Sequence, residues 1–505
     1  MTAVPSRTEA PPSATPTATV RSQFVRANLL GGGVAVATCA WLLARAPTDR
    51  ATTLFGGIHD AQARALFAGH WDLPLRDLGI EAFKIHGHYQ TYFGLWPTVL
   101  RMPVLAVTHR FDGRLTGPSM LLALVVALWA TAGIQWQLRG LLREEVPADG
   151  DAAMGRGEWW ATAGFQALVG CGSIIGFLAS RPLVYHEMEL WGIAGGLAAG
   201  DTLLRYVRGP SLRRAGACTA AATVALLSRP SVGFGVIASF GFVWIVAVVR
   251  RRDSLRFVIA LAVAAIVPVA LYGAMNTARF GSPFALPLEK QVFTQYDSQR
   301  QATLAANGGS LFGAKFVPTT LLQYTRPDAV RFESTFPFVN FPRHRAHVVG
   351  AVVFDTLDRS SSLPASMPGL SLLALTGAWV LFRGREPAHR RARQMLWPIV
   401  LGGVVGTGFV LTIAYVAHRY LADFMPPLVV LAIVGMRFLL QPSRLPRKSR
   451  QKMYLRVGAV ALCLIGAWIS LGLAVVYQRD LRPGDPDYGR GTPAASAAGR
   501  SSNSS

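Results

Sequence analysis

The residues best suited to chemistry begin with a carboxylate just beyond the first apolar stretch of the chain. Asp60 lies in GGIHDAQARALFAGHWDLP, residues 56 to 74. An ionised carboxylate near a membrane interface can accept the proton of an attacking hydroxyl, so Asp60 is a candidate general base. Residues 60 to 69 are also predicted to form a short helix, whose start His59 or Asp60 could cap instead. The catalytic and the capping interpretation both stay open at this point.

A second polar group lies in SRPLVYHEMELWG, residues 180 to 192, in a predicted short loop. His186, Glu187 and Glu189 could coordinate a divalent cation together with Asp60, because carboxylates and imidazoles are suitable ligands. These residues have no fixed metal-ligand spacing. Surface charge at the start of a helix is therefore the more common interpretation.

Two histidines in the first long loop form a third candidate group. His86 and His88, with Tyr89 beside them, are compatible with contact to a metal or a sugar, as is His59. A turn that carries two exposed histidines is the alternative interpretation.

Three arginines predict the binding of an anion. Arg229 lies between two short apolar stretches, Arg279 follows another directly, and Arg419 opens a later one with His418 before it. Arginine pairs bidentately with phosphate oxygens, so these residues are candidate ligands for a lipid-borne phosphate. Snorkelling to lipid headgroups is the alternative, equally favoured for Arg279 and less so for Arg419.

The composition indicates a membrane protein that positions these residues on helices. The chain has 505 residues, of which 51% are apolar and 15% charged. Reading for apolar runs of membrane-spanning length, we expect an all-α integral membrane protein with about eleven transmembrane helices. They are expected near 27–46, 115–134, 161–180, 190–204, 215–228, 232–249, 257–276, 367–382, 396–416, 421–440 and 457–477.

The charge distribution predicts the orientation of these helices. Four alternate loops hold 19 basic and two acidic residues, and they lie near 205–214, 250–256, 383–393 and 444–456. This positive-inside pattern places the N-terminus in the cytoplasm and the C-terminus outside. All candidate residues then gather on the outer side, and the charge of +23 is explained without nucleic acid.

Two long segments are predicted to be extracytoplasmic loops, residues 47–114 and 277–366. Residues 89–110 combine aromatic and apolar residues with two prolines, which predicts an interfacial or re-entrant helix. The transmembrane domain is expected over residues 27–480. Residues 1–26 and 481–505 are expected to be disordered tails.

Several of these motifs carry a resemblance to a known family. The helix from Asp60 to Gly69, HGHYQTYFGLWP at 86–97 with MP at 102–103, NTARFGSP at 276–283 and HRYLADFMPP at 418–427 resemble motifs of the polytopic GT-C glycosyltransferases. The similar bacterial members are of the dolichyl-phosphate-mannose and lipid A sugar-transfer kinds. The resemblance spans residues 27 to 440, and its motifs are short.

The resemblance implies an inverting transferase in the plasma (inner) membrane of a bacterium. It would take a sugar from a polyprenyl-phosphate donor and pass it to a glycan, lipid or protein acceptor at the outer face. Asp60 matches the catalytic acid of the first loop, and the three arginines would hold the donor phosphate. Many relatives carry paired acids in that loop, whereas here Asp60 follows His59 and the next acid is Asp72. This departure leaves open whether a divalent cation takes part.

Two other functions are compatible with the sequence. A glycolipid transporter or flippase needs charged residues within its spans, and Asp201 is one of few candidates. A non-catalytic envelope protein that retains the fold would explain the incomplete acid pair.

Overall fold

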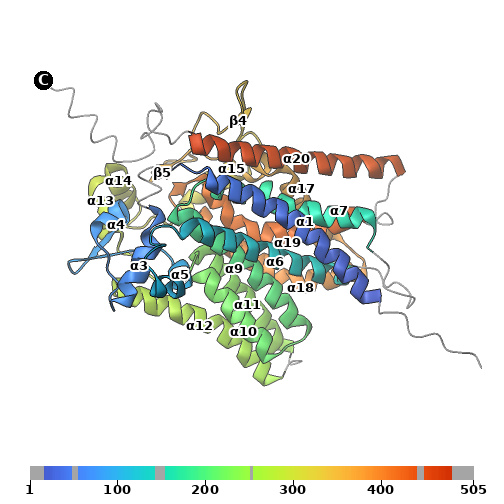
Figure 1. Cartoon of the computed structure of the whole chain (residues 1–505), viewed down its shortest axis with the longest axis horizontal. Coiled ribbons are helices and arrows are strands. Elements are labelled where there is room, and N and C mark those ends of the chain that lie inside the picture. Colours follow the sequence, from blue (N-terminus) through green and yellow to red (C-terminus); the bar gives the residue numbers. More distant parts are fainter. Residues whose placement is uncertain (1–15, 48–54, 143–153, 251–253, 441–448, 480–505) are drawn as a thin grey trace, which may run out of the picture.

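A computed structural model describes residues 16–47, 55–142, 154–250, 254–440 and 449–479 (Figure 1). Long helices dominate these residues, and the strands within them form three two-stranded pairs. Seven helical segments in the described ranges are long and apolar enough to cross a membrane. They are Val20–Ala44 within α1 (Pro16–Ala44), α6 (Thr116–Leu142), α11 (Pro230–Arg250), α12 (Leu255–Phe280), α18 (Pro387–Leu411), His418–Leu440 formed by η4 (His418–Phe424) and α19 (Met425–Leu440), and Met453–Arg479 within α20 (Ser449–Arg479). The protein is thus an all-α membrane protein, as the sequence predicts.

Four further helices lie at the remaining predicted spans. They are α7 (Arg156–Cys171), α9 (Val184–Arg208), α10 (Leu212–Leu226) and α17 (Pro368–Arg383). Every predicted span therefore overlaps a helix, although the span predicted at 161–180 is divided at residues 172–173 into α7 and the short α8 (Ile174–Leu178). That all eleven cross the membrane stays a prediction.

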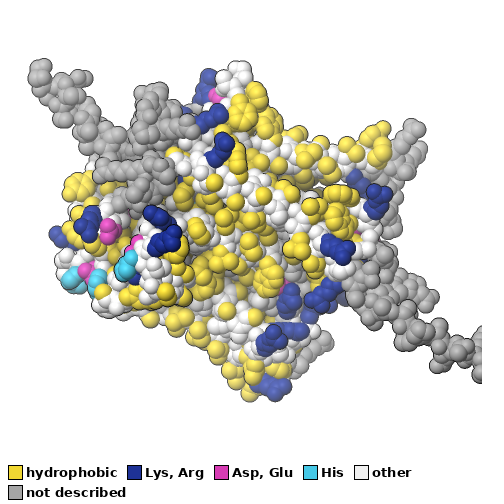
Figure 2. Space-filling model, viewed as in Figure 1, with side chains coloured by type: hydrophobic (Ala, Val, Ile, Leu, Met, Phe, Trp, Pro, Cys, Tyr) yellow, Lys and Arg dark blue, Asp and Glu magenta, His cyan; other side chains and the backbone are white. Residues whose placement is uncertain are grey.

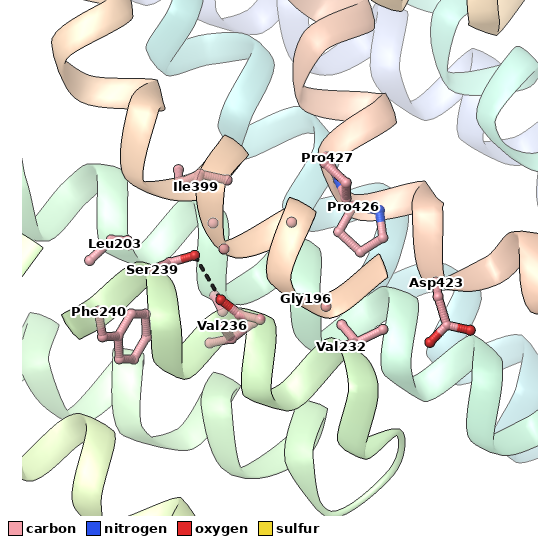
Figure 3. Close-up of a pocket in the computed structure, with 16 residues that line it drawn as sticks. Gly196, Leu203, Val232, Val236, Ser239, Phe240, Ile399, Asp423, Pro426 and Pro427 are labelled. Atoms are coloured by element: carbon pink, nitrogen blue, oxygen red, sulfur yellow. Dashed lines mark hydrogen bonds between the residues drawn. The ribbon is translucent and has the colours of Figure 1, made fainter. Parts of the chain in front are cut away.

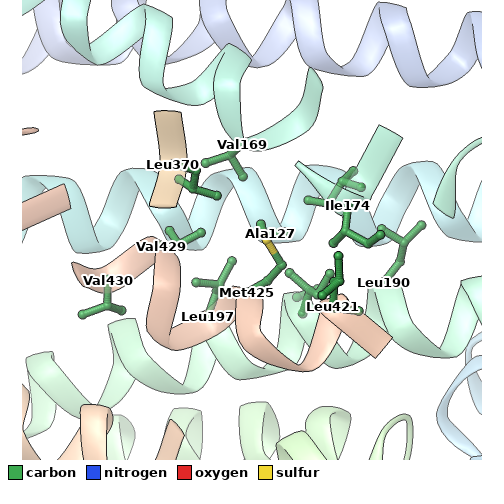
Figure 4. Close-up of a cluster of buried hydrophobic side chains, with 14 of the residues drawn as sticks. Ala127, Val169, Ile174, Leu190, Leu197, Leu370, Leu421, Met425, Val429 and Val430 are labelled. Atoms are coloured by element: carbon green, nitrogen blue, oxygen red, sulfur yellow. The ribbon is translucent and has the colours of Figure 1, made fainter. Parts of the chain in front are cut away.

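Close helix packing depends on small residues. A Cβ atom at Gly377 of α17 would lie 1.9 Å from the carbonyl oxygen of Leu431 in α19. Glycine at such positions lets two helix backbones approach closely, and van der Waals contact then holds the helices together. Apolar side chains such as Leu197, Leu421 and Met425 fill the centre of the bundle (Figure 4).

Several short elements of the two long loops lie at one end of the bundle. α3, α4, α13 and α14 are found there together, at the left of Figure 1. Residues 47–114 contain α3 (Ile58–Phe67), α4 (Leu75–Leu78), η1 (Gly79–Glu81), β1 (Phe83–Ile85), β2 (His88–Gln90) and α5 (Trp96–Val107). Residues 277–366 contain η2 (Leu288–Lys290), α13 (Val292–Tyr296), α14 (Ser298–Ala306), η3 (Ala314–Phe316), α15 (Val317–Thr325), β3 (Arg331–Phe332), β4 (Val339–Asn340), β5 (Thr356–Leu357) and α16 (Leu363–Ser366).

Three strand pairs and one short helix complete the fold. β1 pairs with β2 and β3 with β4, both antiparallel, while β5 runs parallel to β6 (Tyr415–Val416). α8 (Ile174–Leu178) lies between α7 and α9. The two long loops also contact each other, because Val292 donates a backbone hydrogen bond of 2.8 Å to Ala82.

The visible surface separates apolar from charged regions. Figure 2 shows apolar side chains over much of the middle of this face. Acidic, basic and histidine side chains gather together at the end that carries α3 and α4, and basic side chains are prominent toward the opposite end. The two ends thus differ in the kinds of charged side chain they carry, and which side of a membrane each end faces stays a prediction.

Several predicted boundaries differ from the structure. α1 begins at Pro16, so the expectation of a disordered tail was wrong for residues 16–26. Residues 1–15 and the predicted tail 481–505 lie outside the described residues. The predicted helices at 60–69 and 89–110 are present as α3 and α5.

Candidate active site

Asp60 is buried on α3 and paired with an arginine of α5. Its Oδ1 lies 2.7 Å from Nε of Arg101, and its Oδ2 accepts a hydrogen bond of 2.6 Å from the backbone N–H of Gly113. The residue before α3 is Gly57, and no side chain caps this helix. The capping interpretation of His59 and Asp60 was therefore wrong. Asp60 lies in the first turn, where the helix dipole favours a carboxylate.

The surroundings of Asp60 make its carboxylate easier to protonate than that of an exposed aspartate. Burial raises the pKa of Asp60, while the charge of Arg101 and the backbone N–H groups of Gly113 and Leu115 oppose this shift. A carboxylate with a raised pKa is a better proton acceptor. The position is thus suited to base chemistry.

A cavity of about 350 Å³ gives access to Asp60, although only 2% of the residue is exposed. The cavity is lined by residues of α3, α4 and the loop before α6, namely Gly57, Asp60, Ala61, Arg64, Asp77, Asp112 and Gly113. Arg64 and Asp112 form an ion pair of 2.7 Å at its wall. A small polar molecule can therefore approach Asp60 from this side.

Arg101 also binds a second carboxylate, from α9. Its Nη2 donates hydrogen bonds of 2.8 Å to Oε2 of Glu187 and of 2.8 Å to Oγ1 of Thr116. Glu187 is fully buried, and 2% of Arg101 is exposed. Glu187 lies inside α9, so its predicted place in a loop was wrong, as it was for His186 and Glu189.

Arg229 is held by an acid that the sequence prediction did not include. Its Nη2 donates a hydrogen bond of 2.7 Å to Oδ2 of Asp423, and its Nε donates to Oδ1 at 3.1 Å. Ser231 donates a further short hydrogen bond to the same carboxylate. Glu189 contributes a longer contact, with 3.6 Å between its Oε1 and Nη1 of Arg229. This arginine is therefore largely neutralised within the protein.

Arg419 has a different environment, made mostly of aromatic rings. Its guanidinium carbon lies 5.0, 5.4 and 5.2 Å from the ring centroids of Tyr185, Tyr415 and Tyr420. Oε1 of Glu189 is 3.8 Å from its Nε. Such rings stabilise a cation without occupying its N–H groups as a carboxylate would. Arg419 therefore retains more capacity than Arg229 to bind an incoming anion.

The first turns of α9 connect these two clusters. Glu187 pairs with Arg101, which also pairs with Asp60, and Glu189, two residues later, contacts Arg229 and Arg419. Successive α-helical residues rise by about 1.5 Å, so the two glutamates lie close along the helix axis. α9 thus places a carboxylate cluster beside a guanidinium cluster.

Arg279 and His59 lie close to the carboxylate cluster. Arg279 is in the last turn of α12 and not after the helix. Its Nη1 donates a hydrogen bond of 2.9 Å to the carbonyl oxygen of Phe93. Its Nε and Nη2 have no hydrogen-bond partner among the described residues. Nδ1 of His59 is 3.0 Å from Oγ1 of Thr98. Burial lowers the pKa of His59 well below its usual value, and Arg101 and Arg279 add to this, so His59 is neutral at pH 7.

His186 and His418 pack among aromatic rings. The ring centroids of His418 and Phe177 are 4.6 Å apart, and those of His186 and Phe177 are 5.4 Å apart. Nδ1 of His186 lies 2.9 Å from the carbonyl oxygen of Leu178. That His418 binds the donor phosphate stays a prediction.

His86, His88 and Tyr89 belong to the hairpin of β1 and β2. His86 is exposed in its turn with a φ of 49°, and Nδ1 of the exposed His88 is 3.1 Å from Oδ2 of Asp72. Tyr89 is half-buried in β2. This arrangement fits the exposed-turn interpretation, and contact with substrate stays a prediction.

The predicted cation ligands do not converge on one point. Asp60 and Glu187 meet at Arg101, Glu189 faces two other arginines, and His186 faces backbone carbonyl groups. In the described ranges, no group of three or more His, Cys, Asp or Glu side chains is arranged to hold a metal ion.

The sequence prediction placed Arg101 on the outer side without giving it a role in the site, and it did not include Asp423. Each lies in a largely apolar segment, and an ionisable residue in such a segment needs a partner or a task, which was the available signal. Asp201, the candidate for a transport function, is bound by Nε2 of Gln137 at 2.7 Å and by Nε of Arg205 at 2.9 Å.

A second cavity lies between α9, α11, α18 and α19, bordered by Asp423 (Figure 3). Its walls are apolar side chains and glycines, such as Val232, Phe240, Gly402 and Pro426. Its volume is about 30 Å³, and a single water in the liquid occupies about that volume.

The sequence matches no family model, and no curated protein matches it. Among solved structures, the Archaeoglobus fulgidus oligosaccharyltransferase in the apo form is 13% identical, with 92% of this chain and 59% of that chain covered and a TM-score of 0.49. The same organism's AglB, in complex with an inhibitory peptide and a dolichol-phosphate, is 10% identical, with coverages of 93% and 59% and a TM-score of 0.42. ArnT from Cupriavidus metallidurans bound to undecaprenyl phosphate is 14% identical, with coverages of 92% and 75% and a TM-score of 0.41.

These proteins are GT-C glycosyltransferases, the superfamily that the sequence motifs resemble. The chain spans 59% of the length of the oligosaccharyltransferase chains. At TM-scores of 0.49 or less, the likeness carries no argument about chemistry or partners.

Proposed function

We propose that the protein is a membrane glycosyltransferase of the GT-C type. It moves a sugar from a polyprenyl-phosphate donor to a glycan, lipid or protein acceptor at the extracytoplasmic face, with inversion at the anomeric carbon. The observation that carries the proposal is the placement of Asp60 and Arg419 on either side of the first turns of α9, through Glu187 and Glu189. A sugar transfer from a phosphate needs both kinds of group, a base and an anion-binding cation.

In this reaction the acceptor oxygen attacks the anomeric carbon as the bond from that carbon to the phosphate oxygen breaks. The acceptor proton passes to Asp60, and the polyprenyl phosphate leaves with the negative charge. A single displacement of this kind inverts the anomeric centre. Arg419 stabilises the leaving phosphate, because its guanidinium lies among tyrosine rings and its Nε is 3.8 Å from the carboxylate of Glu189.

The charge of the carboxylate cluster supports the role of Asp60 as a base. Asp60 and Glu187 share the single positive charge of Arg101, which leaves one net negative charge in the cluster. The cluster can therefore take up one proton without becoming an isolated buried cation. The cavity of about 350 Å³ beside Asp60 gives the acceptor hydroxyl its approach.

The orientation of the protein is part of the same proposal. The basic loops of the sequence support a cytoplasmic N-terminus, an extracytoplasmic C-terminus and an outer site in the plasma membrane. Phosphate and sugar of a lipid-anchored donor lie at the interface, and the position of α3 and α4 at one end of the helix bundle supports a site there.

Transfer of labelled sugar from synthetic polyprenyl-phosphate sugars, in membranes that contain the protein, tests the proposal. Wild type is compared with Asp60→Asn and with Asp72→Asn, a control in the same loop whose carboxylate contacts the exposed His88. We expect transfer by wild type and Asp72→Asn and its loss in Asp60→Asn. Equal transfer by all three would remove Asp60 as the base. Vesicle translocation of a glycolipid without sugar transfer would favour a transporter.

A further inference from the structure

Arg101 occupies the point between two carboxylates at which a divalent cation would otherwise join them. Asp60 comes from α3, Glu187 from α9 and Arg101 from α5, three segments far apart in the sequence. The guanidinium contacts both carboxylates at 2.7 and 2.8 Å. We infer that Arg101 is a built-in cation that positions Asp60 against Glu187, so that the pair needs and binds no divalent metal ion.

The position of Arg101 is fixed by more than the two acids. Its Nη1 donates a hydrogen bond of 3.4 Å to the carbonyl oxygen of Pro97, one turn earlier in α5, and its Nη2 also donates to Thr116. The hydroxyl of Thr116 donates in turn to the carbonyl oxygen of Gly56, next to α3. The side chain therefore connects α5, α6, α9 and the segment before α3.

A metal ion would have to displace this guanidinium or share the space with it. A guanidinium is a permanent cation in proteins, and a second cation within a few ångströms in a buried site is strongly repelled. Only 2% of Arg101 is exposed, so the side chain has no direct path into solvent. The two acids are thus already neutralised as far as one positive charge allows.

The positioning role rests on the proposed function, whereas the exclusion of a metal ion can be tested without any transfer. Thermal unfolding of the purified full-length protein in detergent, after treatment with EDTA, is measured with and without MnCl2. The variants are Arg101→Ala, which leaves the two carboxylates facing an empty space, and Arg101→Ala combined with Glu187→Gln, which removes one of them. Arg300→Ala is the matched control, because Arg300 is a buried arginine whose ion pair among the described residues is with one carboxylate, Asp355, while its Nη1 donates to the amide of Gln291.

We expect MnCl2 to leave the Tm of wild type unchanged and to raise the lowered Tm of Arg101→Ala. Arg300→Ala and the double variant should show a lowered or altered Tm without a response to MnCl2. A rise in the Tm of wild type that disappears in Glu187→Gln would overturn the inference, because the acids would then bind the metal ion beside Arg101. The same holds if MnCl2 has no effect on folded Arg101→Ala.

Arg101→Lys and Arg101→Met keep the test decisive if the alanine variant does not fold. Lysine retains the charge and methionine retains only the length of the side chain. We expect Arg101→Lys to keep a higher Tm than Arg101→Met, and to keep more of any transfer activity. Equal values for the two variants would show that the charge is not what holds the carboxylates, and the inference would fail.

Discussion

Arg229 and Arg419 contact the same glutamate and the same ring, that of Tyr420, but Arg229 also makes a bidentate ion pair, so replacing each should affect a different property. Arg229 makes a bidentate pair with Asp423, whose side chain is completely buried. Arg419 is surrounded by tyrosine rings, and its contact with Glu189 is 3.8 Å. We expect Arg229→Met to lower stability and Arg419→Gln to weaken use of the donor.

The magnitudes follow from these contacts. Without Arg229, the buried carboxylate of Asp423 keeps the hydroxyl of Ser231 as its one side-chain hydrogen-bond donor among the described residues. Removing one partner of a buried ion pair costs about 3–5 kcal/mol. Arg419→Gln removes charge-assisted hydrogen bonds to the donor phosphate, worth about 1.5–3 kcal/mol, which corresponds to about a 10- to 100-fold loss in kcat/KM.

Two measurements separate the two effects. Thermal unfolding of each purified variant reports stability, and transfer from a polyprenyl-phosphate sugar at varied donor concentration reports kcat/KM. Arg76→Gln, a change at an exposed arginine of the first long loop, serves as the control for both. A normal Tm for Arg229→Met together with a lowered Tm for Arg419→Gln would refute the assignment of one arginine to structure and the other to phosphate.

Three further predictions concern the base, its neighbour and the helix packing. Burial raises the pKa of Asp60 above the ordinary 3.8, so kcat/KM should fall on acidification with a midpoint above that pH. Arg101→Gln removes a charge that lowers the pKa of Asp60 and should move this midpoint to higher pH. An unchanged midpoint in the pH profile would argue against Asp60 as the base. Burial lowers the pKa of His59 below 6.5, so the unfolded chain binds a proton that the folded chain excludes, and stability is lost as pH falls below about 6.5, by up to about 1.4 kcal/mol per pH unit. His59→Asn should therefore show a flatter dependence of Tm on pH than wild type, and an unchanged slope would contradict the neutral state of His59. Gly377→Ala places a methyl group 1.9 Å from a backbone oxygen of α19 and should lower the Tm, whereas Gly458→Ala, which meets nothing within 4 Å, should leave it within a degree or so of wild type.

The helices could be predicted because apolar runs of sufficient length have few alternatives in a membrane. Their ends were harder to predict. The apolar run before Arg279 stops at residue 276, but α12 continues to Phe280 and ends where Gly281 adopts a φ of 73°. The glycine in NTARFGSP carried that signal, since a left-handed residue after a helix favours glycine. An end assigned by hydropathy alone therefore placed Arg279 outside its helix.

The partners within the site could not be predicted from the sequence. Arg101 is 41 residues from Asp60 and 86 from Glu187, and no local pattern links positions so far apart. Glu187 and Glu189 were assigned to a surface loop because charge interrupts an apolar run. In the structure their charges are matched by arginines from other parts of the chain, so α9 can begin at Val184 with both glutamates buried. Ion pairs between residues far apart in the sequence therefore determine where α9 begins, and hydropathy alone does not reveal them.

Gln478, near the end of α20, binds two backbone segments that are synthesised much earlier. Its amide donates hydrogen bonds of 2.9 Å to the carbonyl oxygen of Leu42 at the end of α1 and of 2.7 Å to that of Ser180, just before α9. During synthesis, α1 through α19 leave the ribosome before Gln478, so these two carbonyl groups at first lack the amide that binds them both. The support of the segment that precedes α9 is completed only when residue 478 has emerged. Chains interrupted during translation would thus be membrane-inserted while the start of α9, with Glu187 and Glu189, still lacks this clamp.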